Sequence, residues 1–269
     1  MARISIRAFF IILVAPMKKA TRLLQLIYCF YAILIFALLT ILSVIAMALV
    51  LPFGREKLSN RIYKICRYWS KILYFFLGVR HQEIYEAPHQ FNQAHIFVGN
   101  HNSYMDIPPI VQLKHQPIKP LAKFESSKIP IFGWIYREAV IMVDRSNPDK
   151  RAESLRNLKK ALLNNNSIFI FPEGTFSMTD QYPLKSFFSG AFKLAIELKI
   201  PIQPVLLVDT VERMHFNSIL TLTPGISRVV YLETIQVEEY DLDQVEELKQ
   251  KVYNLMDQGL RRYRNYPPA

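Results

Sequence analysis

A histidine and an aspartate five residues apart mark one place in the chain where chemistry could occur. His101 and Asp106 lie in the segment NHNSYMD, between an apolar run that predicts a strand and a short apolar run that predicts a helix. A carboxylate about one helical turn from an imidazole can accept its N–H, fix its tautomer and stabilise the imidazolium that forms when the ring takes a proton. The pair predicts general-base chemistry, although a helix-capping histidine beside a surface aspartate would show the same spacing.

A second segment, FPEGTFS at residues 171–177, follows the apolar run SIFIF. Gly174 permits a sharp turn there, because glycine has no Cβ and adopts backbone conformations that other residues avoid. Such a turn would project Glu173 and expose backbone N–H groups, which can hold an oxyanion or a polar headgroup. Taken alone, the segment is more typical of an ordinary turn with an exposed glutamate.

Together the two segments resemble the glycerolipid acyltransferase family, whose bacterial members include PlsC-like 1-acyl-sn-glycerol-3-phosphate acyltransferases. The resemblance covers about residues 60–235. It rests on four blocks that occur in the family's order: the His-x4-Asp segment, KFE at 123–125 with IPIFG at 129–133, FPEGT at 171–175, and IPIQPV at 200–205.

The resemblance implies direct transfer of a fatty acyl group from an acyl thioester to a lipid hydroxyl, without an acyl-enzyme. His101 would take the proton of the acceptor hydroxyl and Asp106 would orient His101. Glu173, Gly174 and Thr175 would bind substrate, with backbone donors near Gly174 holding the oxyanion. The expected acceptor is a lysophospholipid, 1-acylglycerol-3-phosphate, which would become phosphatidic acid. The acyl donor would be a thioester of acyl carrier protein or coenzyme A, and no metal or other cofactor is implied.

One position departs from the family pattern. The third block usually has the form FPEGTRS, in which the arginine helps to hold the acceptor's phosphate, and here that residue is Phe176. Phenylalanine cannot make the bidentate contact by which arginine binds phosphate. Either other cations bind the phosphate, with Lys123, Arg145 and Lys185 as candidates, or the acceptor is a lyso-aminolipid such as a lyso-ornithine or lyso-glycine lipid. Surface salt bridges are the alternative role for Lys123 and Arg145.

The elements that must position these residues alternate between strand and helix from residue 95 onward. This alternation predicts an α/β domain with a mostly parallel central sheet flanked by helices. The expected strands cover residues 95–99, 118–122, 140–143, 167–171, 202–208 and 228–232, and the expected helices cover residues 107–113, 148–164, 187–198 and 243–264.

The first 80 residues differ in composition from the rest. They hold 12 of the 33 Lys and Arg residues and one acidic residue, Glu56, whereas residues 81–269 hold 21 basic and 21 acidic residues. Residues 23–54 carry no charge. As a helix this run would extend about 48 Å, more than the ~30 Å of a bilayer core. It predicts a tilted membrane-spanning helix or a re-entrant hairpin. The basic residues at both ends slightly favour the hairpin and leave the orientation open.

A basic amphipathic helix is expected next, because Lys and Arg recur every three or four residues from Lys57 to Lys71. Such a helix can lie flat in the headgroup layer or pack on the domain as an ordinary surface helix. We therefore expect an N-terminal membrane-embedded helical segment over residues 1–80 and an acyltransferase domain over residues 81–269. The basic surplus beside the apolar run favours membrane lipids over nucleic acid as partners.

The family resemblance implies a location at the cell inner membrane, with the domain facing the cytoplasm. Cys29 and Cys66 form no evident disulfide framework, which agrees with a reducing or membrane setting. Two other classes of protein share parts of the pattern. An inactive membrane-binding scaffold would have no need of the His101, Asp106 and Glu173 side chains. A membrane-associated hydrolase would need a nucleophile elbow, and the sequence contains no G-x-S-x-G.

Overall fold

The computed structural model describes residues 19–50, 58–114, 117–123, 139–143, 147–176 and 183–264. The strands in these residues are β1 Val79–Tyr85, β2 Ile96–Gly99, β3 Ile118–Lys123, β4 Ile141–Val143, β5 Ser167–Ile170, β6 Ile202–Leu207 and β7 Gly225–Tyr231. The helices are α2 Lys19–Val50, α3 Leu58–Phe76, α4 Ile107–Gln112, α6 Pro148–Leu163, α7 Gly190–Leu198, α8 Thr210–Arg213 and α9 Val245–Arg264, with short 3-10 turns η2 Tyr104–Asp106, η4 Ile219–Thr221 and η5 Leu242–Gln244.

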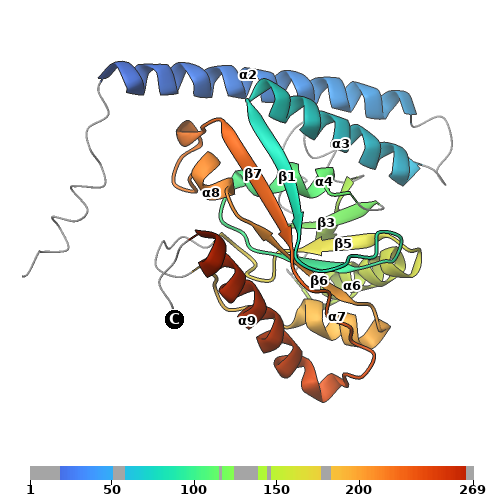
Figure 1. Ribbon diagram of the computed structural model, residues 1–269. Helices are drawn as coiled ribbons and strands as arrows, with labels where there is room; N and C mark the ends of the chain where they lie inside the picture. The colour runs from blue at the N-terminus through green and yellow to red at the C-terminus, as the bar shows by residue number, and fades with distance from the viewer. Residues whose placement is uncertain are drawn as a thin grey trace, which may run out of the picture.

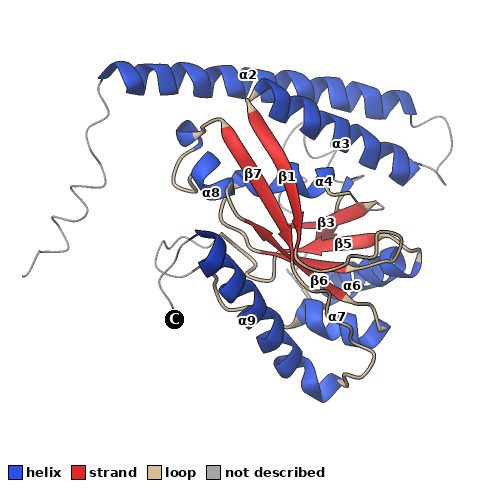
Figure 2. Ribbon diagram, viewed as in Figure 1, coloured by secondary structure: helices blue, strands red, loops and turns tan. Residues whose placement is uncertain are grey.

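Among the described residues, seven strands form one sheet in the spatial order β1-β7-β6-β2-β5-β3-β4. The neighbouring strands are parallel except for β6 and β7, which are antiparallel. Helices lie on both sides of the sheet (Figures 1 and 2). The structure thus confirms the mostly parallel α/β sheet that the sequence predicts.

The central strands are buried on both faces. In β2, Ile96 and Val98 pack in one cluster with residues of α6, α7 and α9, while Phe97 packs in another cluster with residues of α4. The side chains of all three residues are completely buried. Successive side chains of a strand point to opposite faces, so a strand covered on both sides needs the uninterrupted apolar sequence that β2 and β5 have.

Strand β1 has no counterpart in the elements expected from the sequence. It pairs with β7 at the edge of the sheet, from Val79 opposite Gly225 to Tyr85 opposite Tyr231. Its sequence, VRHQEIY, mixes buried and exposed residues. An edge strand needs apolar contacts along only part of its length, and so it lacks the continuous apolar run by which the inner strands were found.

Helix α2 is a single helix of 32 residues that lies across one end of the domain (Figure 1). It is long and apolar enough to cross a membrane. Many of its large apolar side chains are exposed, among them Leu24, Phe30 and Leu34. Residues 23–50 contain no glycine or proline that would break a helix. They therefore form the continuous helix and not the re-entrant hairpin, while residues 51–57 lie outside the described residues.

Helix α3 returns along α2 and joins it to the sheet domain. The Tyr28 hydroxyl of α2 donates to the Leu77 carbonyl at 2.7 Å, and the rings of Phe36 and Trp69 meet edge to face at 5.7 Å between centroids. On its other side α3 packs against α4, where the Ser70 hydroxyl donates to the Pro108 carbonyl at 2.6 Å. The expected amphipathic helix is thus present. Part of its apolar face, including Ile62 and Leu73, is buried, while Ile72 and Phe76 are exposed.

Candidate active site

The two predicted segments meet at one edge of the sheet because the strands before them are parallel neighbours. Strands β2 and β5 pair from Ile96 opposite Ile168 to Val98 opposite Ile170. The carboxyl ends of parallel strands lie at the same edge, where α/β proteins commonly place their sites. His101 follows β2 and Glu173 follows β5, and the backbone N–H of His101 donates to Oε1 of Glu173 at 2.9 Å.

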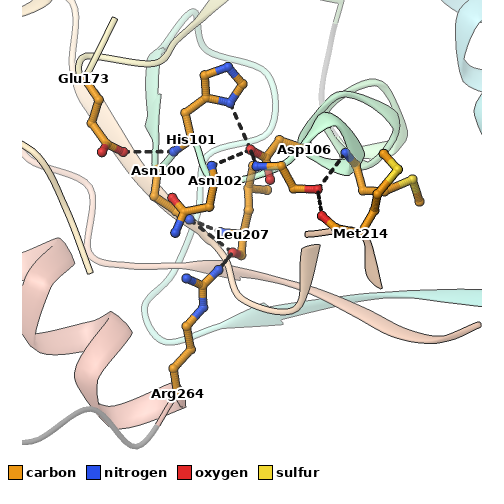
Figure 3. Close-up of polar contacts among 10 residues, drawn as sticks. Asn100, His101, Asn102, Asp106, Glu173, Leu207, Met214 and Arg264 are labelled. Carbon is orange, nitrogen blue, oxygen red and sulfur yellow. Dashed lines mark hydrogen bonds and ion pairs between the residues drawn. The ribbon is translucent and has the colours of Figure 1, made fainter. Parts of the chain in front are cut away.

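The imidazole of His101 is oriented by Asp106. Its Nδ1 lies 2.9 Å from Oδ2 of Asp106, and the same oxygen accepts the backbone N–H groups of Asn102 and Ser103, each at 2.8 Å. Ser103 caps the turn η2, so the turn itself carries Asp106 back toward the histidine. A carboxylate acceptor at Nδ1 favours the tautomer with the proton on Nδ1 and leaves Nε2 as the basic nitrogen. Figure 3 shows this second nitrogen pointing away from Asp106.

Aromatic rings enclose the imidazole on two sides. The ring of Phe171 stacks on His101 with centroids 3.9 Å apart and an interplanar angle of 15°. The ring of Phe176 meets His101 edge to face at 4.3 Å, and Tyr104 meets Phe176 in the same manner at 4.8 Å. These apolar walls reduce the access of water to the imidazole and hold the ring in one plane.

Glu173 is buried, and both of its oxygens accept backbone N–H groups. Oε1 accepts from His101 and Oε2 from Lys185, each at 2.9 Å. Burial raises the pKa of the Glu173 carboxyl to about 7, the two backbone hydrogen bonds oppose the rise, and the nearby charge of Asp106 adds to it. Through these bonds Glu173 ties the segment after β5 to the backbone of His101.

Two further side chains of the His101 segment anchor it to neighbouring elements. The Asn100 amide accepts the Leu207 N–H at 2.8 Å and donates to the Leu207 carbonyl at 3.1 Å, which ties the end of β2 to β6. The Ser103 hydroxyl donates to the Met214 carbonyl at 2.6 Å. Sequence analysis gave neither residue a role. Asparagine and serine are common in loops, and their partners lie more than 100 positions away in the sequence.

The other predicted substrate-binding residues lie at different distances from this centre. Gly174 has the positive φ of 70° that its turn requires, and its N–H donates to the Phe171 carbonyl at 3.1 Å. Thr175 is exposed next to it. Lys185 adjoins the site, where its ammonium group donates to the Phe176 carbonyl at 2.7 Å. Lys123 ends β3, but its side chain and the whole of Arg145 lie outside the described residues.

An apolar cleft begins beside the residue that follows Asp106. It has a volume of about 110 Å³ and is lined by Ile107 and Val111 together with residues of α2, α3 and β3. Its walls include Met47, Ile62 and Leu121. The residues that line the cleft are spread over positions 40–140, so no local pattern could locate it.

Comparisons with known proteins show which proteins this chain resembles. A family model described as Acyltransferase matches residues 78–208, which include His101, Asp106 and Glu173. A chloroplast 1-acyl-sn-glycerol-3-phosphate acyltransferase of Arabidopsis thaliana is 29% identical over 244 residues, which are 89% of this chain and 66% of that protein. The chain therefore spans just under two thirds of the plant relative's length. A 1-acyl-sn-glycerol-3-phosphate acyltransferase of Haemophilus influenzae is 28% identical over 247 residues, which are 91% of this chain and 95% of that protein.

A solved structure has the same fold. The crystal structure of the 1-acyl-sn-glycerophosphate acyltransferase PlsC from Thermotoga maritima superposes with a TM-score of 0.69 and 23% sequence identity, and the match covers 94% of this chain and 100% of that one. At 23% identity this structural similarity supports only the fold, whereas the sequence matches above support the relation to acyltransferases. Residues 78–208 of this chain therefore match the acyltransferase family, and the chain is similar over most of its length to 1-acyl-sn-glycerol-3-phosphate acyltransferases.

Proposed function

We propose that this protein is a membrane-bound O-acyltransferase that moves a fatty acyl group from an acyl thioester to the free hydroxyl of 1-acylglycerol-3-phosphate, giving phosphatidic acid. The observation that carries the proposal is the pairing of His101 with the buried carboxylate of Asp106 at 2.9 Å, next in the chain to Ile107, which lines an apolar cleft. Its relatives named 1-acyl-sn-glycerol-3-phosphate acyltransferases support the choice of acceptor.

In the proposed reaction, Nε2 of His101 takes the proton of the acceptor hydroxyl while the oxygen attacks the carbonyl carbon of the thioester. A new C–O bond forms, and the carbonyl oxygen becomes an oxyanion in a tetrahedral intermediate. When the intermediate collapses, the C–S bond breaks and the departing thiolate receives the proton from the imidazolium. Asp106 stabilises the imidazolium between these two steps. General-base assistance of this kind contributes typically about 10²–10⁴-fold to a rate.

The acyl chain of the donor would occupy the apolar cleft beside Ile107. The lining is almost entirely apolar, and burial of a chain there is favourable at about 0.8 kcal/mol per methylene group. Helix α2, with its exposed apolar side chains, would associate with the membrane that supplies the lysolipid. The acyl group would be supplied as a thioester of acyl carrier protein or of coenzyme A, and the proposed chemistry is the same for both.

The direct test is acyl transfer by the purified protein in lipid nanodiscs. A radiolabelled acyl thioester is supplied, as coenzyme A and as acyl-carrier-protein conjugates, together with a set of lysolipid acceptors. We expect labelled phosphatidic acid from lysophosphatidic acid. Release of free fatty acid without acyl transfer to any acceptor would contradict the proposal and favour a hydrolase.

One observation favours a second candidate acceptor. Phe176 occupies the position at which the family pattern has a phosphate-binding arginine, and its ring lies 4.3 Å from the ring of His101. An apolar ring so near the reacting hydroxyl favours an acceptor without a phosphomonoester, such as a lyso-ornithine or lyso-glycine lipid. Side-by-side values of kcat/KM for lysophosphatidic acid and a lyso-aminolipid distinguish the two.

A further inference from the structure

We propose that Arg264, the last residue of α9, is a positioning residue for the reaction because it fixes the backbone of His101 through the side chain of Asn102. The inference rests on the proposed acyl transfer and assigns a role to a part of the chain 163 positions from the histidine. Figure 3 shows Arg264 reaching from the C-terminal helix toward Leu207 and Asn102, behind the histidine segment.

Each of the three nitrogens of the Arg264 guanidinium group has an acceptor. Its Nε donates to the Val208 carbonyl at 2.6 Å and its Nη2 to the Leu207 carbonyl at 2.7 Å, both at the end of β6. Its Nη1 lies 2.9 Å from the amide oxygen of Asn102. The three acceptors match the fixed fork of an arginine, whose planar donors lose little freedom when they bind several oxygens at once.

Asn102 connects this fork to the histidine. The hydrogen-bonding partners assign the orientation of its amide, with the oxygen toward Arg264 and the nitrogen donating to the His101 carbonyl at 3.1 Å. The backbone N–H of Asn102 donates to Oδ2 of Asp106 at 2.8 Å. Asn102 is buried, with 4% of its surface exposed. One residue thus contacts both members of the pair, and Arg264 holds that residue from behind.

The need for such a support follows from the shape of the segment. Residues 100–103 form an irregular loop between β2 and η2, without the ladder of hydrogen bonds that holds a strand or helix. Its anchors to other elements are few: Asn100 makes two hydrogen bonds to Leu207 of β6, the His101 N–H makes one to Glu173, and the Ser103 hydroxyl makes one to Met214. Arg264 supplies the anchor for the His101 carbonyl. A general base must be held close to its productive geometry, and a displacement of about 1 Å can cost about 10²-fold in rate.

The test compares Arg264→Ala, Arg264→Gln and Arg264→Lys with wild type in the full chain. We expect kcat to fall about 10- to 100-fold in the Ala and Gln variants, with KM for both substrates nearly unchanged, because the support acts on the base and not on binding. Lysine keeps the charge and reaches one or two of the three oxygens, so Arg264→Lys should recover part of the loss. The matched control is Arg262→Ala, since Arg262 lies in the same helical turn, is 63% exposed and pairs with Glu86 away from the site. It should retain wild-type kcat.

A double-mutant cycle with Asn102→Ala tests the route. If Arg264 acts through Asn102, the double variant loses no more activity than the more damaged single variant, whereas independent effects would multiply. Rates are measured well below each variant's melting temperature. A variant with a lower melting temperature but wild-type kcat would overturn the proposal, because that is the result of a purely structural role. Should Arg264→Ala fail to fold, Arg264→Lys and Arg264→Gln decide by the same criterion. Absence of acyl transfer by the wild-type protein would instead reject the proposed function.

Discussion

The Nδ1 atom of His101 lies 2.9 Å from Oδ2 of Asp106, and the two side chains differ sharply in exposure: the imidazole side chain is 18% exposed and the carboxylate is completely buried. The charged partner is thus sealed inside the protein, where water cannot compete for its hydrogen bonds, while the imidazole reaches the surface where substrates arrive. This division suits a general base, which must be both steered and accessible.

The first prediction concerns the histidine. His101→Ala removes the only group in the proposed mechanism that takes the hydroxyl proton, so kcat should fall by at least about 10³-fold. The loss should leave the fold intact, because the contacts of Asp106 with the N–H groups of Asn102 and Ser103 do not involve the imidazole. Acyl transfer is measured with circular dichroism as the check on folding. Turnover near the wild-type rate in a folded His101→Ala protein would rule out the assigned role.

A second prediction concerns the glycine at the end of β2. A Cβ added at Gly99 would lie 2.5 Å from Cζ and 2.8 Å from Cε1 of Phe169, a completely buried ring. The ring centroids of Phe169 and Phe171 are 5.1 Å apart, and Phe171 stacks on His101. A shift of the Phe169 ring is therefore transmitted through Phe171 to the imidazole. Gly99→Ala should therefore lower the free energy of unfolding by about 1–3 kcal/mol and also lower kcat.

Gly190→Ala is the matched control for this overpacking. Gly190 is the first residue of α7, and an added Cβ would meet no atom within 4 Å. The same substitution should there stabilise the protein by about 0.4–1 kcal/mol, because alanine restricts the unfolded chain more than glycine. The test is to measure the free energies of unfolding of Gly99→Ala and Gly190→Ala in parallel. Equal effects at both positions would show that the contact with Phe169 is not the cause.

A third prediction concerns the pH dependence of stability. Burial raises the pKa of Glu173 from 4.5 to about 7 in the folded protein. The folded state therefore holds this proton more tightly than the unfolded state. The stability that comes from the group is fully present below pH 4.5 and is lost as the pH rises through about 7. The loss is on the order of 3 kcal/mol at most.

Glu173→Gln removes this ionisation and keeps the shape of the side chain. The free energy of unfolding of wild type, relative to that of the variant, should decline between about pH 5 and pH 8 and then level off. Chemical unfolding of both proteins at a series of pH values gives the difference directly. Parallel profiles over this range would show that the carboxyl has an ordinary pKa.

Sequence patterns predicted the fold where burial dictates residue type along a continuous stretch. The buried strands β2, β5 and β6 are mostly apolar, with Ser167 at the start of β5 and Gln203 within β6 as the polar exceptions. Helix α6 begins with Asn147 as its cap and a proline at its first turn. Strand β1 was not predicted, because it is an edge strand with several polar residues. Helix α7 begins at Gly190, three residues later than the predicted start at residue 187. Where a helix or strand depends on contacts with distant segments, local pattern carries little information.

The candidate site, like the fold, was predicted from the sequence only in part. His101, Asp106 and Glu173 were predicted together, because their motifs and the order of these motifs along the chain match the family. Arg264 could not be predicted, since nothing in the sequence RRYR distinguishes it from Arg261 and Arg262. Its role depends on how α9 packs across the sheet, which only the fold supplies.

The last prediction concerns the acceptor headgroup. The ring of Phe176 lies edge to face with the imidazole at 4.3 Å between centroids, so a side chain at this position would lie near the acceptor hydroxyl in the proposed reaction. Phe176→Arg adds a fork of donors that can bind a phosphate. A charge-assisted hydrogen bond contributes about 1.5–3 kcal/mol. We therefore expect the ratio of kcat/KM for lysophosphatidic acid to kcat/KM for a lyso-aminolipid to rise about tenfold or more.

Phe176→Leu separates the added charge from the lost ring. Leucine removes the aromatic contact with His101 and Tyr104 without introducing a donor, so kcat should fall for both acceptors while their ratio stays close to that of wild type. If the arginine and leucine variants show the same ratio, position 176 does not face the headgroup, and the selectivity lies with other cations such as Lys185, whose ammonium group is bound to the Phe176 carbonyl at 2.7 Å. A rise confined to the arginine variant assigns headgroup choice to this position, because a charge placed far from the phosphate would be screened by water and would change both acceptors alike.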